Sequence, residues 1–492
     1  MNIAALLTIT GDQPVADTIA SLAVLPVTAI AQSVPMGNDA QSTDCLPIAV
    51  AQEWSKQALI TYLQWFLKTD ARHLLIVTGP GVPVFNANGI QRMISCIEST
   101  GASLVYGDWF EATGDGAVEL RQCIDYQQGS IRDTFNFGPA LLVNGTFIPS
   151  ILDELTSDDC DYTYGGRYDL RLRLSEKAPV RRLPEPLYHC ISETAGDRHA
   201  AHFAYVDPRN RAYQVEMEQT ATTHLRRIGA FITPPEKQPL DDSGSFPVEA
   251  SVIIPVRNRQ KTIADAVDSA LSQQTDFPFN VIVVDNHSTD DTTKILAAKA
   301  TTDTRLVHYI PQRTDLLIGG CWNEAVYSPQ CGRYAVQLDS DDIYDGTGVV
   351  QQIIDAFRKE RCALVIGSYT TVNFDLKLLP PGLIDHREWT DNNGMNNALR
   401  IAGLGAPRAY HVPTLRRFGF PNVSYGEDYA AVLRLSRSYP VGRIYESLYW
   451  CRRWDENSDS RLSPETANRY DHYKDALRSV EIAARIRKVE CR

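Results

Sequence analysis

Acidic side chains follow two apolar, β-branched segments in the second half of the chain. Asp285 ends the segment NVIVVD, and Asp339, Asp341 and Asp342 follow the segment RYAVQL. Such segments predict buried strands of a parallel sheet, where ligands bind beyond the carboxyl ends of the strands. Closely spaced carboxylates there suit a hard divalent cation that keeps other positions for water and phosphate oxygens. An aspartate after a strand can also be simple turn chemistry, but three acids in four residues favour a metal site.

Strands and helices alternate around these acids. The segments EASVIIPV (249–256) and TRLVHYI (304–310) predict two further strands. Apolar residues with a helical period run from Thr262 to Ser272, and further helical segments are expected after Asp291 and around 322–327. This alternation predicts βαβ units, a mostly parallel sheet and an α/β fold.

The chain also contains a long internal repeat. Residues 164–190 and 425–451 align without a gap at an offset of 261, and two earlier pairs of segments align in the same order. We therefore expect two copies of one α/β domain, a linker rich in Pro and Asp between them, and an amphipathic helical tail whose apolar stripe, Val480 included, packs back on a domain. The expected boundaries are 1–227 for the first copy, 228–247 for the linker, 248–460 for the second copy and 461–492 for the tail.

Five segments of the second copy resemble the family 2 glycosyltransferases of the GT-A fold. They are SVIIPVRNR, IVVDNHSTDDT, LDSDD, YGEDY and LYWCRRW, in the order and spacing that are typical of that family. The resemblance covers nearly all of residues 250–460. It implies an inverting, metal-dependent transfer of a sugar from a nucleotide-diphosphate donor, with a UDP-sugar favoured. The acceptor would be a hydroxyl of a carbohydrate or lipid-linked molecule in polysaccharide or glycoconjugate biosynthesis.

The resemblance further implies which residues hold the donor. Pro255, Val256 and Arg257 resemble the loop that holds the nucleotide base and ribose, and Asp285 resembles an acid that contacts uracil or ribose. Two arginines, Arg452 and Arg453, could clamp the diphosphate.

The metal and the catalytic base are implied in the same way. Asp339 and Asp341 match the family's metal motif, so that Mn²⁺ or Mg²⁺ would neutralise the charge that builds on the leaving diphosphate. Glu427 and Asp428 match its acidic pair. An attacking hydroxyl must lose its proton, and a carboxylate within hydrogen-bond reach can take it. We expect Asp428 to be this base, with Glu427 as the alternative.

Several positions depart from the family's pattern or have simpler explanations. Arg259, Trp322 and Trp454 stand where many members carry other residues, which leaves the donor and processivity open. Both tryptophans could be core residues, and the arginines at 452–453 could be solvated. The acid pair at 427–428 could only complement a helix dipole.

The first copy keeps framework residues but not the acids. By the alignment, Asp339–Asp342 become Thr78-Gly79-Pro80-Gly81 and Asp285 becomes Ala31. The acid pair becomes Gly166-Arg167, and the first loop becomes Thr10-Gly11-Asp12. We therefore expect a pseudo-glycosyltransferase domain that folds without binding a metal–nucleotide complex.

Composition limits the remaining function classes. The 492 residues carry a net charge of −12, which argues against a nucleic-acid binder. The ten cysteines form no CxxC pair, and the first residues lack the basic region of a secretory signal. A cytoplasmic protein is expected, with membrane contact at most peripheral, at the inner face. The alternatives are a nucleotidyltransferase-type enzyme, and a non-catalytic carbohydrate-binding or scaffold protein.

Overall fold

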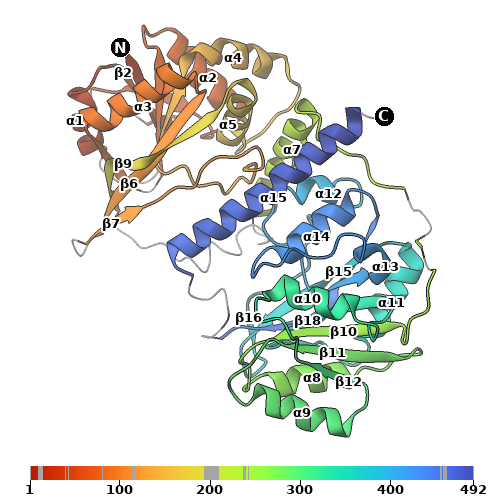
Figure 1. Ribbon diagram of the computed structural model, residues 1–492. Coiled ribbons are helices and arrows are strands. Elements are labelled where there is room, and N and C mark those ends of the chain that lie inside the picture. Colours follow the sequence, from red (N-terminus) through yellow and green to blue (C-terminus); the bar gives the residue numbers. More distant parts are fainter. Residues whose placement is uncertain are drawn as a thin grey trace. The chain divides into compact units, whose positions relative to one another are not determined.

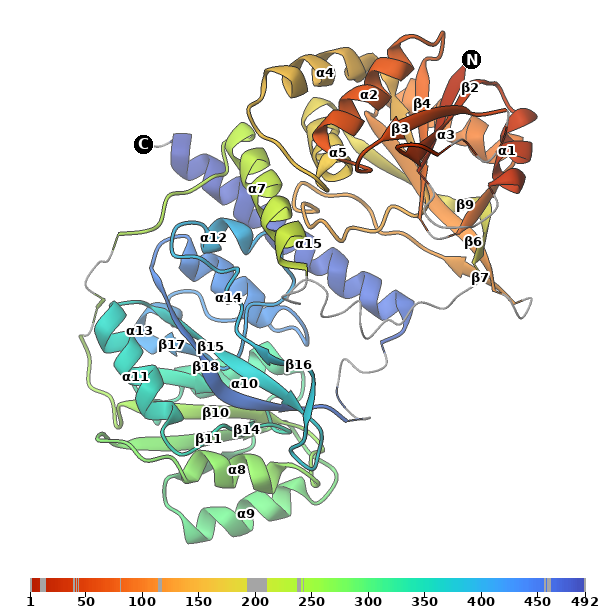
Figure 2. The same cartoon turned by 180° about the vertical axis from the view of Figure 1, so that it is seen from behind.

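The protein forms two compact units. The computed structural model describes residues 2–8, 15–38, 40, 42, 44–79, 81–113, 117–192, 210–236, 240–241, 243–454, 457 and 462–490. Unit 1 consists of Met1–Phe231 together with Pro464–Arg492, and unit 2 consists of Ile232–Ser463 (Figures 1 and 2). The chain thus leaves unit 1, builds unit 2 and returns to unit 1 with its last helix.

Unit 2 is built on one mixed sheet. Its strand order is β12-β11-β10-β13-β17-β15-β18-β14, with β16 paired to β15, and the four strands β12, β11, β10 and β13 run parallel. The strands are β10 (Ala250–Val256), β11 (Phe279–Asp285), β12 (Leu306–Tyr309), β13 (Tyr334–Gln337), β14 (Ile343–Tyr344), β15 (Leu364–Val372), β16 (Leu378–Ile384), β17 (Arg408–His411) and β18 (Val441–Arg452). The first four strands confirm the strands that the apolar segments predicted.

Helices cover both faces of this sheet (Figure 1). Helices α8, α9 and α11 share one core cluster with alternate residues of β10, and α10 packs against β10 and β11. The helices are α8 (Ile263–Leu271), α9 (Thr292–Thr302), α10 (Ile318–Tyr327), α11 (Val349–Glu360), α12 (Gly394–Asn397), α13 (Val412–Leu415) and α14 (Glu427–Ser436). Because both faces are covered there, the strands β10, β11 and β13 are buried along almost their whole length, and acidic groups follow at the strand ends.

Unit 1 repeats this topology strand for strand. Its order is β3-β2-β1-β4-β8-β6-β9-β5, with β7 paired to β6. The strands are β1 (Ile3–Thr8), β2 (Val27–Pro35), β3 (Leu46–Val50), β4 (His73–Thr78), β5 (Val82–Phe85), β6 (Leu104–Thr113), β7 (Val118–Arg121), β8 (Ala140–Asn144) and β9 (Val180–Ser192). The helices are α1 (Ala16–Ala23), α2 (Lys56–Leu67), α3 (Ala87–Thr100), α4 (Ile148–Ser157), α5 (Gly166–Lys177), α7 (Arg211–Arg227) and α15 (Pro464–Glu490), with a 3₁₀ turn at Gly145–Phe147. The tandem α/β arrangement predicted from the sequence repeat is confirmed.

The repeat extends to single contacts in the sheets. The long parallel pair β6–β9 shifts register beside Gly107, and its counterpart β15–β18 shifts beside Gly367. A Cβ atom on Gly107 would lie 2.4 Å from the side chain of Leu187, and one on Gly367 would lie 2.9 Å from that of Leu448. Each glycine therefore makes room for the same repeated leucine.

Helix α15 closes unit 1 with a face that the sequence analysis did not predict. An apolar stripe that includes Val480 was expected to pack, but Val480 is 70% exposed and Asp475 is fully buried. Asp475 accepts a hydrogen bond from Ser130, and the backbone N–H of Gly129 donates to Ser479. Tertiary polar contacts thus override the apolar period. Among the described residues, no helix has the length and the apolar character needed to cross a bilayer.

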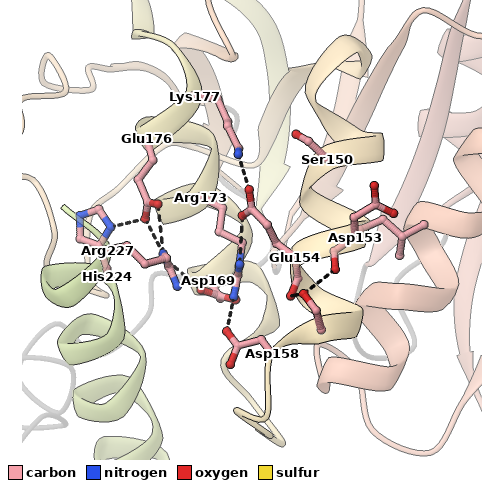
Figure 3. A network of polar contacts seen from close by, with 12 residues as sticks. Ser150, Asp153, Glu154, Asp158, Asp169, Arg173, Glu176, Lys177, His224 and Arg227 are labelled. Atoms are coloured by element: carbon pink, nitrogen blue, oxygen red, sulfur yellow. Dashed lines mark hydrogen bonds and ion pairs between the residues drawn. The ribbon is translucent and has the colours of Figure 1, made fainter.

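A buried polar network joins α4, α5 and α7 in unit 1 (Figure 3). The guanidinium of Arg173 lies at its centre, 2.8 Å from Asp169, 3.1 Å from Glu154 and 2.7 Å from Asp158. Asp169 also lies 3.3 Å from Arg227. Because the guanidinium offers donors in a fixed planar fork, one side chain can hold three carboxylates of two helices and a loop.

Replacing Arg173 with Met should destabilise unit 1 by about 3 kcal/mol, because Asp169 stays buried without its main counter-charge. Arg92→Met is the matched control, since the ion pair of Arg92 with Glu185 is exposed and should contribute little to the free energy of unfolding. Urea denaturation of the full chain measures both. Equal effects of the two substitutions would show that the network does not stabilise the unit.

Candidate active site

The carboxyl ends of the parallel strands bring the predicted donor-binding residues to one edge of unit 2. In the pairing of β10 with β11, Pro255 lies opposite Val284, and Val256 opposite Asp285. Arg257 follows β10 and is exposed. The acidic loop begins two residues after β13, which pairs with the other side of β10.

Asp285 is fully buried and serves the loop that follows β11. Its carboxylate accepts hydrogen bonds from the backbone N–H of Ser288 at 3.0 Å and the hydroxyl of Thr293 at 2.5 Å, and lies 3.3 Å from Nε2 of His308. Burial disfavours the charged form, but the hydrogen bonds from His308, Ser288 and Thr293 outweigh it and hold the pKa of Asp285 well below its usual value. The ionised carboxylate of Asp285 therefore stabilises the loop that follows β11. Its contact with a donor stays a prediction.

Asp339, Asp341 and Asp342 form a cluster of carboxylates after β13. Burial raises the pKa of Asp339 and the charge of Asp341 adds to this, against a hydrogen bond from Gln337. Burial, Asp341 and Asp339 together raise the pKa of Asp342 well above its usual value. Carboxylates that repel one another in this way favour a bound cation.

The donor set fits a divalent ion that takes few protein ligands. Within the described residues, no group of three or more His, Cys, Asp and Glu side chains is arranged to hold a metal alone. Ions such as Mg²⁺ are usually bound through one or two carboxylates and complete their shell with water and substrate phosphates. Asp339 and Asp341 can supply that part of the shell.

The strand end of β18 closes over the acidic loop. Arg452 is buried, with its backbone N–H 2.7 Å from Asp342, its Nε 2.5 Å from the carbonyl of Asp341 and its Nη1 2.8 Å from Asp265. The side chain of Arg452 thus shapes the loop and is not solvated. The backbone of Arg453 donates to Val372 at 2.7 Å.

The two tryptophans that depart from the family pattern have different surroundings. Trp322 is buried against Tyr410 and Phe420 and is a core residue. Trp454 lies at the site, where its indole N–H donates to Asp341 at 3.3 Å. The Nε atom of Arg259 lies 4.0 Å from the same carboxylate.

The acid pair begins helix α14. Gly426 precedes it in the left-handed region at φ 88°, so the chain turns sharply into the helix. Asp428 lies 2.8 Å from Nη2 of Arg408 and keeps 29% of its side chain exposed. Glu427 is buried, and burial with the charge of Asp428 raises its pKa to about 8, against the charge of Arg408.

Arg408 is a site residue that the sequence analysis missed. It starts β17, the antiparallel neighbour of β13, and its backbone N–H donates to Gln337 at 3.1 Å. Arg408 thus joins the strand that leads to Asp339 with the helix that starts at the acid pair. It lies outside the five family-like segments, and only the pairing of the sheet reveals its position.

Unit 1 places different side chains at the matching points. Thr78 ends β4, and Gly166 starts α5 with Arg167 beside it. The expected match of Ala31 with Asp285 is wrong, because Ala31 pairs with Leu6, whereas Asp285 pairs with Val256, three residues further along the equivalent strand. The register puts Val34, which is also buried, in the place of Asp285. Ala31 and Thr78 are buried. Pro80 and the segment 10–12 lie outside the described residues. Where the residues are described, the matching edge of unit 1 does not repeat the carboxylates of unit 2.

The comparisons with known proteins agree with the geometry of unit 2. Residues 251–412 match the family model described as Glycosyl transferase family 2. Unit 2 therefore contains a glycosyltransferase family 2 domain. This family match spans the acidic loop and Arg408, and it ends before the acid pair.

Curated relatives share only part of their length with this chain. One is "Chondroitin synthase" from Escherichia coli, 38% identical over 121 residues, which are 25% of this chain and 17% of the relative. Another is "O-antigen biosynthesis protein RfbC" from Myxococcus xanthus, 32% identical over 128 residues, which are 25% of this chain and 10% of the relative.

Solved structures resemble the chain at low identity. The first 349 residues of S. aureus TarS in complex with UDP-GlcNAc match at 22% identity and a TM-score of 0.38, over 47% of this chain and 66% of that one. The mannosyltransferase PcManGT from Pyrobaculum calidifontis, in complex with GDP-Man and Mn²⁺, matches at 16% identity and a TM-score of 0.34, over 58% of this chain and 83% of that one. The fold assignment above follows from the strand order and not from these likenesses.

The raised pKa of Glu427 predicts a pH-dependent stability. Between its usual pKa and about 8, the unfolded state loses the proton that the folded state keeps, so wild-type stability falls as pH rises. Glu427→Gln removes this effect. The variant should therefore gain on wild type between pH 5 and 8, by up to about 1.4 kcal/mol per pH unit.

Urea denaturation of the full chain at pH 5, 6.5 and 8 measures this gain. Glu446→Gln is the control, because Glu446 is exposed and its carboxylate is solvated in both states. A flat difference between Glu427→Gln and wild type over this range would contradict the prediction.

Proposed function

We propose that unit 2 transfers a sugar, with inversion, from a nucleotide-diphosphate sugar to a hydroxyl of a glycan or lipid-linked acceptor. A UDP-sugar is the favoured donor, and polysaccharide or glycoconjugate biosynthesis is the favoured setting. The observation that carries the proposal is the placement of two acidic groups in one family 2 domain. The acidic loop after β13 and the acid pair of α14 are linked through Arg408 and Gln337.

Asp341 and Asp339 would hold Mn²⁺ or Mg²⁺ in this proposal. When bound, the ion supplies Lewis-acid stabilisation of the charge that develops on the diphosphate. Arg452 sets the shape of the loop through the carbonyl of Asp341 and the carboxylate of Asp342. Arg453 adds positive charge beside it.

The nucleotide would lie on the loops after β10 and β11. Pro255, Val256 and Arg257 would contact the donor from one side, and the loop that Asp285 organises would contact it from the other. Arg257 is exposed at the sheet edge and can contact an anionic or polar part of the donor.

Asp428 would take the proton of the acceptor hydroxyl. As the hydroxyl oxygen bonds to the anomeric carbon, the bond from that carbon to the diphosphate oxygen breaks and its electron pair leaves with the diphosphate. Asp428 is the more accessible acid of the pair, and Arg408 stabilises its charged form. Glu427 is the alternative base, because a pKa of about 8 suits proton transfer near neutral pH.

Unit 1 would serve as a pseudo-glycosyltransferase domain that stabilises the active unit, binds acceptor or mediates assembly. Its domain limits remain those expected from the repeat, with the last helix as part of the same unit. The proposed location is cytoplasmic, with membrane contact at most peripheral.

The internal repeat provides a matched control for the metal site. Asp341→Asn in the full chain should lower Mn²⁺-dependent hydrolysis of a nucleotide-diphosphate sugar by about 100-fold or more, because it removes the charge that the ion needs. Thr78→Ala, at the strand end of unit 1 that matches Asp339, should leave the rate unchanged. Nucleotide release measures both, after a screen of UDP- and GDP-sugars.

The same assay with acceptor tests the base. Asp428→Asn should lower the transfer rate by about 100-fold or more while Mn²⁺ binding persists. The assignment of the metal site to unit 2 is overturned when Thr78→Ala abolishes hydrolysis and Asp341→Asn does not.

A further inference from the structure

Arg408 occupies a position between the two acidic groups of unit 2. It is the first residue of β17, and its side chain is 15% exposed. Its Nη2 lies 2.8 Å from Asp428, its Nη1 donates to the carbonyl of Gly405 at 2.6 Å, and its backbone N–H donates to Gln337 at 3.1 Å. The guanidinium is therefore fixed through Nη1 by the backbone carbonyl of Gly405, and its Nη2 points at the acid pair.

Other charged and titratable groups also face this guanidinium. Asp428 and Glu427 come from α14, Tyr410 from β17 itself, and Asp339 from the loop after β13. Burial opposes the charge of Arg408, but Asp428, Tyr410, Asp339 and Glu427 outweigh burial and raise its pKa above the usual value. The guanidinium of Arg408 therefore keeps its proton more firmly than an arginine in water does.

The position that matches Arg408 in unit 1 carries no charge. Leu75 pairs with Leu142 in unit 1, and the repeat-equivalent Val336 pairs with Ala409 in unit 2. The residue before Leu142, Leu141, thus matches Arg408, and it is buried. The cation and the carboxylates around it are replaced together in unit 1, while the strands that carry them are kept.

We propose that Arg408 is a positioning residue of the transfer reaction: it holds Asp428 ionised and oriented to accept the proton of the acceptor hydroxyl. The proposal rests on the proposed function, in which Asp428 is the base. A fixed guanidinium favours the carboxylate form of Asp428 and leaves the proton of the acid pair to Glu427. Its anchor at Gly405 sets the direction in which the Asp428 side chain points.

The test compares three substitutions in the full chain. Arg408→Leu reproduces the side chain of unit 1, Arg408→Gln keeps polarity without charge, and Arg408→Lys restores the charge without the planar fork. The first two should lower kcat for transfer about 10- to 100-fold, a share of what a positioned base contributes, with little change in KM for the donor. Lysine should recover part of the loss.

The pH profile separates positioning from a structural role. Without the guanidinium, Asp428 binds a proton more readily, so the acidic limb of the kcat/KM profile should move up by about one pH unit in Arg408→Leu. Arg305→Gln is the control. It removes an ion pair of 2.7 Å between Arg305 and Asp303, directly before β12, and should leave the pH profile unchanged.

An infrared titration of the carboxylates provides a readout that does not depend on activity. The carboxylate signal that is missing in Asp428→Asn should titrate at higher pH in Arg408→Leu than in wild type. An active wild type in which neither this signal nor the pH profile moves would overturn the role of Arg408. A wild type without activity toward the screened donors, in which the signal still moves, would overturn the proposed function and leave the charge coupling in place.

Discussion

The arrangement of unit 2 depends on the repulsion among carboxylates gathered at one end of a buried sheet. Asp339, Asp341 and Asp342 share one loop, and Glu427 and Asp428 begin α14, where Asp428 contacts Arg408 of the same sheet. Such a group is stable only with counter-charges or protons. Arg408 and Arg452 provide the charges within the protein, Glu427 keeps a proton, and the proposed metal would complete the balance.

The same constraint explains why two units of one topology differ in chemistry. The strand order and even the register shifts beside Gly107 and Gly367 recur in both units, because they depend on backbone pairing and apolar packing. The carboxylates add nothing to that packing. Unit 1 lacks these carboxylates and its sheet is intact. Without the carboxylates, no cation is needed at the position of Arg408, and Leu141 occupies it.

In unit 1 the buried charges instead hold helices and loops together. The Arg173 network ties three helices together (Figure 3). Asp475 ties the last helix to the loop at 129–132. In both sets the carboxylates are paired with cations of the same unit. The contrast is physical: buried carboxylates paired with cations are compensated within the fold, whereas carboxylates that crowd one another favour a bound ion.

The sequence by itself determined the α/β class, the repeat, the strands β10 to β13 of unit 2 and the candidate acids, because apolar periodicity and the repeated spacing are local properties of the chain. It did not reveal Arg408, since β17 meets β13 only through antiparallel pairing of distant segments. It misjudged the buried face of α15, because partners in the loop at 129–132 override the apolar stripe. The tertiary structure alone decided which acids face a counter-charge, because burial and distance set the energy of a charge.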